Sequence, residues 1–238
     1  MLKVDLHVHT PACDGFSPVE KLVKQAKKLG LSAFAVCDHN TCTPLPDCGF
    51  PLIPAIEVST TKGHIVGLYI DPAKMNRFTR DNLPAPDEAI EAIHAAGGVA
   101  VLAHPFEFGH ITEDDLDGFT PDFIEINNSR AVLKYRDANA RAAAYAQKRG
   151  IPQTGGSDAH CAAELGGSYT EVDCDDVSEL EAAIRAGKTR SVFVRRSRWR
   201  YKGRAELSAV THVRLGVRRT LRAPLYFAYT LIRDLFDR

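Results

Sequence analysis

Histidine and carboxylate side chains recur at close spacing in this 238-residue chain. His7 and His9 stand two residues apart at the end of an apolar segment, and Asp158 and His160 repeat that spacing. Side chains at positions i and i+2 of a strand point to the same side, so each pair can converge on one point. Mixed imidazole and carboxylate ligands suit zinc, manganese or iron. The pattern therefore predicts a metal site.

Five further candidates stand where other apolar segments begin or end. The nine predicted ligands are His7, His9, Asp14, His39, Glu57, His64, His104, Asp158 and His160. One such histidine alone is more often an ordinary, partly buried side chain, but six of the nine histidines fall at these positions. Nine ligands exceed the needs of one ion, and a carboxylate such as Glu57 can bridge two. We expect two or three divalent ions, whose charge would attract a phosphate dianion and lower the pKa of bound water.

Apolar runs and amphipathic stretches alternate along most of the chain. Predicted strands cover residues 2–9, 33–38, 52–58, 64–70, 99–103, 123–127, 153–157 and 191–194, and predicted helices cover 17–30, 86–96, 131–149 and 178–186. This alternation favours an α/β fold with mainly parallel strands, and its length fits a small, irregular barrel. Active sites of parallel barrels lie where the carboxyl ends of the strands meet, which would bring the nine candidates together.

The last 44 residues differ in character, so we predict a division into a barrel, 1–194, and a basic amphipathic extension, 195–238. The extension holds 12 Lys and Arg against 3 Asp and Glu, whereas the remainder holds 18 against 27. Apolar residues at helical spacing predict two short helices, one on each side of Pro224. The extension can pack on the acidic body, contact nucleic acid through residues 195–204, where arginines interleave with aromatic side chains, or lie on a membrane surface through 224–236.

The remaining features point to a reduced, cytoplasmic enzyme. The amino-terminal residues lack the apolar core of a signal peptide, and no segment approaches the ~20 apolar residues of a transmembrane helix. The six cysteines include no Cys-x-x-Cys pair, and reduced thiols are expected. Nucleotide-binding glycine loops and the serine or cysteine nucleophile motifs are missing from the sequence, so those enzyme classes are not indicated.

Six stretches resemble, in order, motifs of the polymerase and histidinol phosphatase (PHP) superfamily: VDLHVHT, CDHNT, PAIEVST, GHIVGLYID, VLAHP and GSDAH. The resemblance implies a distorted (β/α)7 barrel that holds two or three metal ions, here manganese, zinc or iron. It assigns the first metal to His7, His9, Glu57 and Asp158. The second would share Glu57 and add His64 and His104, and the third would take Asp14, His39 and His160.

The same resemblance implies a metal-dependent phosphoesterase that acts on nucleotides or short oligonucleotides. A metal-bridging hydroxide would attack phosphorus, with Asp158 and His160 as catalytic residues. We expect Arg130, Lys134 and Asn127 to contact the substrate. Only residues 71–98 separate GHIVGLYID from VLAHP, so the inserted lid of such relatives is expected to be missing or minimal and the mouth more open. The alternatives are a histidinol-phosphate-type phosphomonoesterase and a nucleic-acid-associated module that grips through its basic extension.

Overall fold

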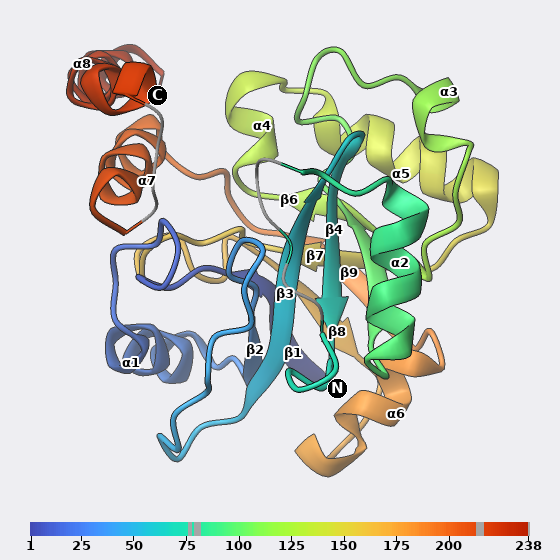
Figure 1. Ribbon diagram of the computed structural model, residues 1–238. Helices are drawn as coiled ribbons and strands as arrows, with labels where there is room; N and C mark the ends of the chain where they lie inside the picture. The colour runs from blue at the N-terminus through green and yellow to red at the C-terminus, as the bar shows by residue number, and fades with distance from the viewer. Residues whose placement is uncertain (76–77, 79–81, 213–216, 238) are drawn as a thin grey trace.

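The framework of the molecule is one mixed sheet that curls until its edges nearly meet (Figure 1). The computed structural model describes residues 1–75, 78, 82–212 and 217–237. Within them the sheet has nine strands in the order β7-β6-β5-β4-β3-β2-β1-β8-β9. They are β1 (Leu2–Val8), β2 (Ala33–Val36), β3 (Leu52–Thr60), β4 (Gly63–Leu68), β5 (Val99–Ala103), β6 (Phe123–Asn128), β7 (Gln153–Gly156), β8 (Ser168–Val172) and β9 (Thr189–Phe193).

Helices surround this sheet, and two more form the carboxyl-terminal extension. They are α1 (Val19–Leu29), α2 (Pro86–Ala95), α3 (Glu113–Leu116), α4 (Ala131–Lys134), α5 (Ala138–Arg149), α6 (Leu180–Arg185), α7 (Trp199–His212) and α8 (Val217–Phe236), with a 3-10 turn at Val177–Glu179. The predicted α/β barrel with a helical extension is thus confirmed. The predicted helix over 131–149 is instead two helices, because Tyr135 adopts an extended conformation between them.

The predicted parallel arrangement holds for four of the eight strand pairings, and two reversed strands account for the other four. The strands β1, β2 and β3 are parallel, as are β5, β6 and β7, but β4 runs antiparallel to both of its neighbours and β8 to both of its own. Only Thr61 and Lys62 separate β3 from β4. A parallel partner needs a crossover of a dozen or more residues, so this tight connection forces a hairpin.

The edges of the sheet are joined by side chains. The hydroxyl of Thr189 on β9 donates to the carbonyl oxygen of Gln153 on β7 at 2.8 Å, and the amide of Asn127 donates to Ser191 Oγ at 2.9 Å. Thr170 of β8 exchanges hydrogen bonds with the backbone of Gly155. Strand β8 was not predicted, because polar side chains such as Thr170 fill its buried positions and remove the apolar pattern of a strand.

A break in register on β1 turns its histidines toward the inside of the barrel. Val4 and Leu6 belong to the apolar cluster formed with inward-facing residues of the other strands, whereas Val8 packs beneath α1. The pairing of β1 with β2 shifts between Asp5 and Val8, as in a β-bulge. Because a bulge inserts one residue, the side chains after it change face. His7 therefore follows Leu6 to the inner side.

The carboxyl-terminal extension is a helical hairpin docked over one end of the barrel (Figure 1). Helices α7 and α8 cross closely at Gly203, where an added Cβ would lie 1.9 Å from Thr230 Oγ1. The predicted boundary at Pro224 lies inside α8, and residues 213–216 are outside the part of the chain that the structure describes. In α8, Leu225 and Ile232 remain exposed, and a membrane-surface role for 224–236 stays a prediction.

The aromatic and cationic residues after 195 hold this hairpin together. Arg198 and Arg200 both pair with Asp234 of α8, Arg196 pairs with Asp237, and the indole of Trp199 is buried. These contacts support the docked extension. Nucleic-acid contact through 195–204 and the division at residue 194 remain predictions.

Candidate metal centre

Glu57 lies at the centre of a cluster of imidazoles at one end of the barrel. Its carboxylate oxygens are 2.7 Å from His64 Nδ1, 2.9 Å from His39 Nδ1 and 3.0 Å from His104 Nε2. His9 Nε2 and His7 Nε2 follow at 3.4 and 3.5 Å. Five histidines from four parts of the chain therefore converge on one buried carboxylate. The reversed strand β4 explains why His64, at its beginning, reaches the same place as residues at the ends of parallel strands.

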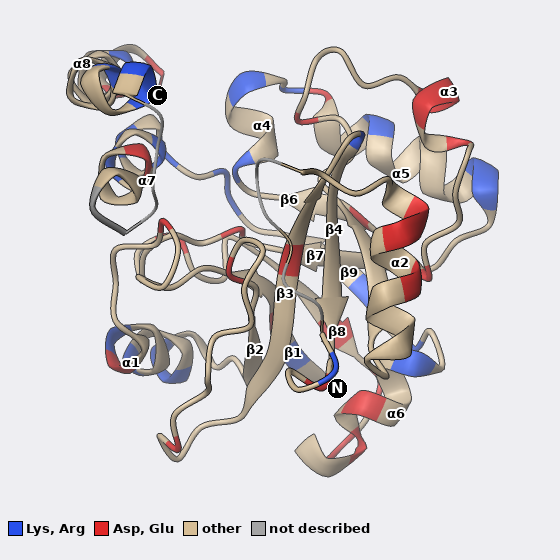
Figure 2. Ribbon diagram, in the orientation of Figure 1, with Lys and Arg blue, Asp and Glu red and all other residues tan. Residues whose placement is uncertain are grey.

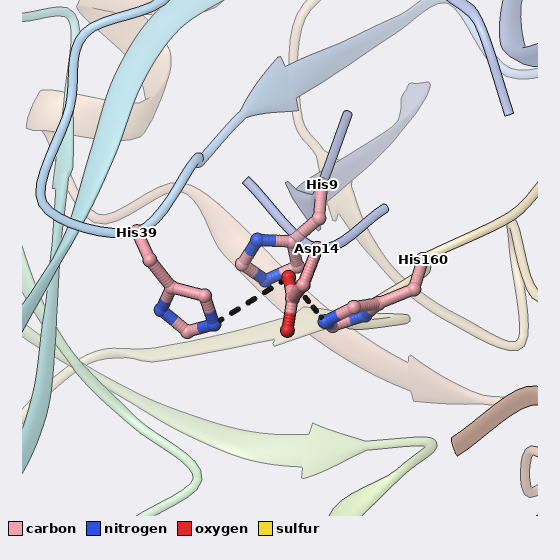
Figure 3. Close-up of side chains that lie close together, drawn as sticks. All are labelled: His9, Asp14, His39 and His160. Atoms are coloured by element: carbon pink, nitrogen blue, oxygen red, sulfur yellow. Dashed lines mark ion pairs between the residues drawn. The ribbon is translucent and has the colours of Figure 1, made fainter. Parts of the chain in front are cut away.

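A second group of ligands gathers around Asp14 (Figure 3). Asp14 Oδ1 lies 3.1 Å from His160 Nε2 and 3.8 Å from His39 Nε2, and His9 completes the group. One ligand atom from each of these four residues lies within 4.8 Å of the other three. Such spacing allows one ion to contact all of them. Cys13 is adjacent, with its sulfur 3.5 Å from His9 Nδ1, and all six cysteines are free thiols.

Asp158 connects the two parts of the cluster. Its Oδ1 lies 3.3 Å from His9 Nε2 and 3.4 Å from His160 Nδ1. Asp158 and His104 both have positive φ angles, 55° and 29°, although neither is glycine. Such backbone conformations are disfavoured and persist where the surroundings enforce them, often at functional sites. All nine predicted ligands are thus brought together by the fold.

The buried nitrogen and oxygen atoms of the cluster are ligand atoms of the kind that bind cations. His7 Nε2, His9 Nε2 and Glu57 Oε2 are buried and, within the described part of the chain, have no hydrogen-bond partner. Buried polar atoms without a hydrogen bond are costly inside a protein, and three of them in one cluster fit a group that supplies positive charge. Hard carboxylate oxygens mixed with imidazole nitrogens suit divalent transition metals.

The protonation states of the cluster agree with this interpretation. Burial alone would raise the pKa of Glu57, but the charges of His39, His64 and His7 hold it well below its usual value. Burial and the neighbouring His160 lower the pKa of His9 to about 4, so its imidazole is neutral. His104 shows the opposite direction: burial would lower its pKa, but the hydrogen bond to Glu57 and the charges of Glu107 and Glu57 together raise it to about 9. Metal binding at such a site releases protons, since ligands bind deprotonated.

Carboxylates outside the predicted set support the ligands. Glu125 Oε1 lies 3.1 Å from His7 Nδ1, and its other oxygen accepts a hydrogen bond from the backbone N–H of His104 at 3.0 Å. Glu107 lies 3.4 Å from His104 Nδ1. Glu164 accepts from the backbone N–H of His160 at 2.9 Å. Sequence reasoning missed these residues; a charged residue inside the apolar strand β6 was the available signal for Glu125.

Above the cluster lies a cavity of about 740 Å³. Its floor includes Glu57 and Asp158, and part of its wall comes from α7 and α8, including Lys202 and Tyr226. The inserted lid is missing or minimal, as predicted, but the more open mouth expected from it is partly walled by these two helices. The inserted segment is indeed short, but the carboxyl-terminal hairpin covers the site in its place, which the chain order alone did not reveal.

The three residues predicted to contact substrate lie in different places. Arg130 is buried in the cavity wall, with its guanidinium 3.2 Å from Glu164 and its Nε 4.0 Å from Asp158. Lys134 is exposed and lies over the ring of Tyr135, and Asn127 bonds to Ser191; neither lines this cavity. Asn128 accepts from the backbone N–H groups of Arg130 and Ala131 and so caps α4.

Comparison with known proteins identifies the family. The model of the PHP domain matches residues 5–103, and that of a PHP-associated region matches residues 136–189. The chain belongs to the PHP superfamily of metal-dependent phosphoesterases. Eight of the nine clustered residues lie within these two matches, His104 follows directly after the first, and neither match includes α7 or α8.

Related PHP proteins resemble the chain to different extents. A protein of Methanocaldococcus jannaschii is 29% identical over 181 residues, covering 71% of this chain and 69% of its own length. The 5'-3' exoribonuclease Rnm of Salmonella typhimurium is 38% identical over 82 residues, 29% of this chain and 28% of its own. The 3',5'-nucleoside bisphosphate phosphatase of Chromobacterium violaceum is 32% identical over 85 residues, 31% of this chain and 30% of its own.

Solved structures share the PHP fold. PsfC from Pseudomonas syringae superimposes with a TM-score of 0.63 at 16% identity, over 96% of this chain and 98% of its own. A candidate metal-dependent phosphoesterase from Bifidobacterium adolescentis gives 0.59 at 19% identity, over 76% of this chain and 95% of its own. None of the described helices combines the length and apolarity needed to cross a bilayer.

Proposed function

We propose that this PHP protein hydrolyses phosphate esters of nucleotides or short oligonucleotides with two or three divalent metal ions. The observation that carries the proposal is the convergence of nine nitrogen and oxygen ligands on Glu57 and Asp14, beneath a cavity of about 740 Å³. Cavities of 300–1,000 Å³ are typical of small-molecule sites. Two of the relatives are named for nucleotide or RNA substrates, which supports the same class here.

The assignment of ligands to ions follows the family resemblance, and overlapping groups of neighbouring ligands support it. His7, His9 and Asp158 form one group. His7, His64 and His104 all approach Glu57 Oε1, whereas His9 and His39 approach Oε2. Asp14, His39 and His160 form the third group together with His9. Manganese, zinc and iron all accept such ligands. Bound ions would polarise the phosphoryl oxygens and lower the pKa of water.

The chain's own residues orient the ester. Arg130 is the cation of the cavity wall nearest Asp158, and its planar guanidinium can donate two parallel hydrogen bonds to a phosphate. Its pairing with Glu164 fixes its direction before substrate arrives. Asp158 lies between His9 and His160, where its carboxylate can accept a proton or hydrogen bond from the attacking water.

The test is a substrate panel joined to metal analysis. The protein, purified with manganese, zinc or iron, is assayed on adenosine 3',5'-bisphosphate, 5'-phosphorylated dinucleotides, histidinol phosphate and p-nitrophenyl phosphate. We expect bound metal and hydrolysis of the nucleotide substrates. Preference for histidinol phosphate would indicate the phosphomonoesterase alternative, and a metal-free protein without hydrolysis would refute the proposal.

A matched pair of histidine variants separates the cluster from the rest of the molecule. His9→Ala removes a ligand shared by two of the groups, whereas His94→Ala removes an exposed imidazole paired with Asp122 on the outside. We expect loss of metal and activity only in His9→Ala. Undiminished hydrolysis in that variant would contradict the metal mechanism.

A further inference from the structure

The carboxyl-terminal hairpin forms part of the wall of the active-site cavity. Its contribution comes from both helices and comprises Lys202, Ala205, Glu206, Arg219, Arg222, Ala223, Leu225 and Tyr226. Neither family model includes this segment, since the second match ends at residue 189. The surface facing the metal ligands is therefore a feature of this chain beyond its PHP framework.

Buried polar contacts fix the hairpin over the cavity. Lys202 of α7 donates to Glu107 Oε1 at 2.6 Å, and Glu107 in turn lies 3.4 Å from His104. The backbone N–H of Ser197 donates to the carbonyl oxygen of Ser129 at 2.8 Å, next to Arg130. These contacts involve residues beside the metal ligands. The residues that hold the hairpin in place therefore also contact the metal centre.

The hairpin presents cations whose charges are offset to different degrees. Glu107 offsets Lys202, and Glu206 holds Arg219 through a hydrogen bond of 2.6 Å. Arg222 lines the cavity one turn after Arg218, is exposed, and has no acidic partner within the described residues. Figure 2 shows basic residues on both α7 and α8. Arg222, beside Arg219, thus leaves positive charge available at the mouth.

We propose that Arg222, assisted by Arg219, binds a second anionic group of the substrate while the reacting phosphate lies at the metal centre. This inference rests on the proposed phosphoesterase function and narrows its substrate class to esters with two phosphates, such as nucleoside bisphosphates and 5'-phosphorylated oligonucleotides. A guanidinium suits this task because it stays charged and forms paired hydrogen bonds with phosphate oxygens. The reacting phosphate and the second one then contact different elements, the barrel and the hairpin.

The test compares Arg222→Gln with Arg218→Gln, which removes an exposed arginine of the same helix that does not line the cavity. For adenosine 3',5'-bisphosphate, Arg222→Gln should raise KM about tenfold, as expected for loss of one charge-assisted contact, with kcat within about twofold. Hydrolysis of p-nitrophenyl phosphate, which has one phosphate, should be unchanged. Arg218→Gln should match the wild type on both substrates.

Calorimetry on protein treated with a chelator gives a readout independent of turnover. Arg222→Gln should weaken binding of adenosine 3',5'-bisphosphate about tenfold and leave binding of inorganic phosphate unchanged. Equal effects on both ligands, or no effect on the bisphosphate, would overturn the second-anion site while leaving the phosphoesterase intact. A wild-type protein that hydrolyses none of these esters would instead refute the proposed function itself.

Discussion

At the scale of single residues, Glu57 decides whether the centre can hold ions, because it alone contacts imidazoles of all the groups around it. Glu57→Gln keeps the volume of the side chain and removes its charge. We expect metal content to fall and hydrolysis to drop more than about 100-fold, since loss even of supporting contacts typically reduces metal affinity or activity 10–100-fold. Metal analysis and steady-state kinetics measure both.

The control for this change is Glu113→Gln, which removes an exposed carboxylate paired with Lys148 on the surface. Exposed ion pairs contribute little, about 0–1 kcal/mol, so activity and metal content should stay near wild type. If Glu57→Gln retained its metals, Glu57 would not be a bridging ligand.

Glu107 links the hairpin to the metal centre. Burial would raise its pKa, but the charges of Lys202 and His104 lower the pKa of Glu107 to about 2, so it is ionised. Glu107→Gln weakens both contacts, and we expect activity to fall about 10–100-fold, as for other groups that orient metal ligands. Steady-state kinetics test this.

The double variant Glu107→Gln/Lys202→Met shows whether the contacts form one network. Residues in direct contact usually couple, so the double variant should lose less activity than the two single losses multiplied together. Independent, multiplicative losses would show that Lys202 does not act through Glu107.

At the scale of elements, the sequence predicted which segments carry ligands. It predicted less well the direction in which the strands run and their side chains point. The i, i+2 spacing of His7 and His9 predicted that they share a side, and they do. Their inward direction depends on the register shift between Asp5 and Val8, which arises from pairing with β2 and leaves no mark in the local pattern. The antiparallel direction of β4 and the polar strand β8 depend in the same way on tertiary contacts.

The crossing of α7 and α8 makes Gly203 sensitive to substitution. An added Cβ would lie 1.9 Å from Thr230 Oγ1 and 3.1 Å from the backbone of Phe227, so the helices must separate. Overpacking of this kind destabilises by about 1–3 kcal/mol, which exceeds the ~1 kcal/mol that alanine gains over glycine in a helix. We therefore expect Gly203→Ala to lower the thermal unfolding midpoint and expose the hairpin to proteases.

Two comparisons check the origin of this effect. Gly118→Ala adds a Cβ with no atom within 4 Å and should leave stability nearly unchanged. Thr230→Ala in the Gly203→Ala background removes the closest contact and should restore part of the stability. A lack of any such recovery would place the effect elsewhere.

Asp237, just past the end of α8, makes the stability of the hairpin depend on pH in the acidic range. Burial would raise the pKa of Asp237, but hydrogen bonds from Arg196 and Trp199, together with the charge of Arg136, hold it below its usual value. Its contribution is therefore fully present above the unfolded-state pKa of about 3.9 and is lost as the pH falls through the lower folded-state value.

Denaturant unfolding of Asp237→Asn across this range tests the dependence. The variant should be less stable than wild type by a constant amount near neutral pH, and the difference should shrink below about pH 4. Asp47→Asn, in the loop before β3, is the control. A difference that persisted unchanged in strong acid would show that the charge of Asp237 is not its source.

At the scale of the whole molecule, the position of the extension was the part that sequence reasoning could least determine. Its charge contrast with the barrel left docking, nucleic-acid contact and membrane contact open. Docking depends on long-range pairs such as Lys202 with Glu107 and Ser208 with the carbonyl oxygen of Gly15, which join residues about 95 and 193 positions apart. Local sequence periodicity carries no information about such pairs, so the position of the hairpin over the cavity was not predicted.

A chain that ends at residue 194 separates the roles of the barrel and the hairpin. All nine proposed ligands lie before residue 161, so the truncated chain should still bind metal and hydrolyse p-nitrophenyl phosphate. It should lose stability, because Trp199, Ala205 and Ala209 bury apolar surface that the truncation removes. Its KM for adenosine 3',5'-bisphosphate should rise at least as much as in Arg222→Gln, since the hairpin cations are gone. If KM and stability were unaltered, the hairpin would neither cover the cavity in solution nor contact the substrate. If the truncated chain could not bind metal, the hairpin would be part of the metal centre itself.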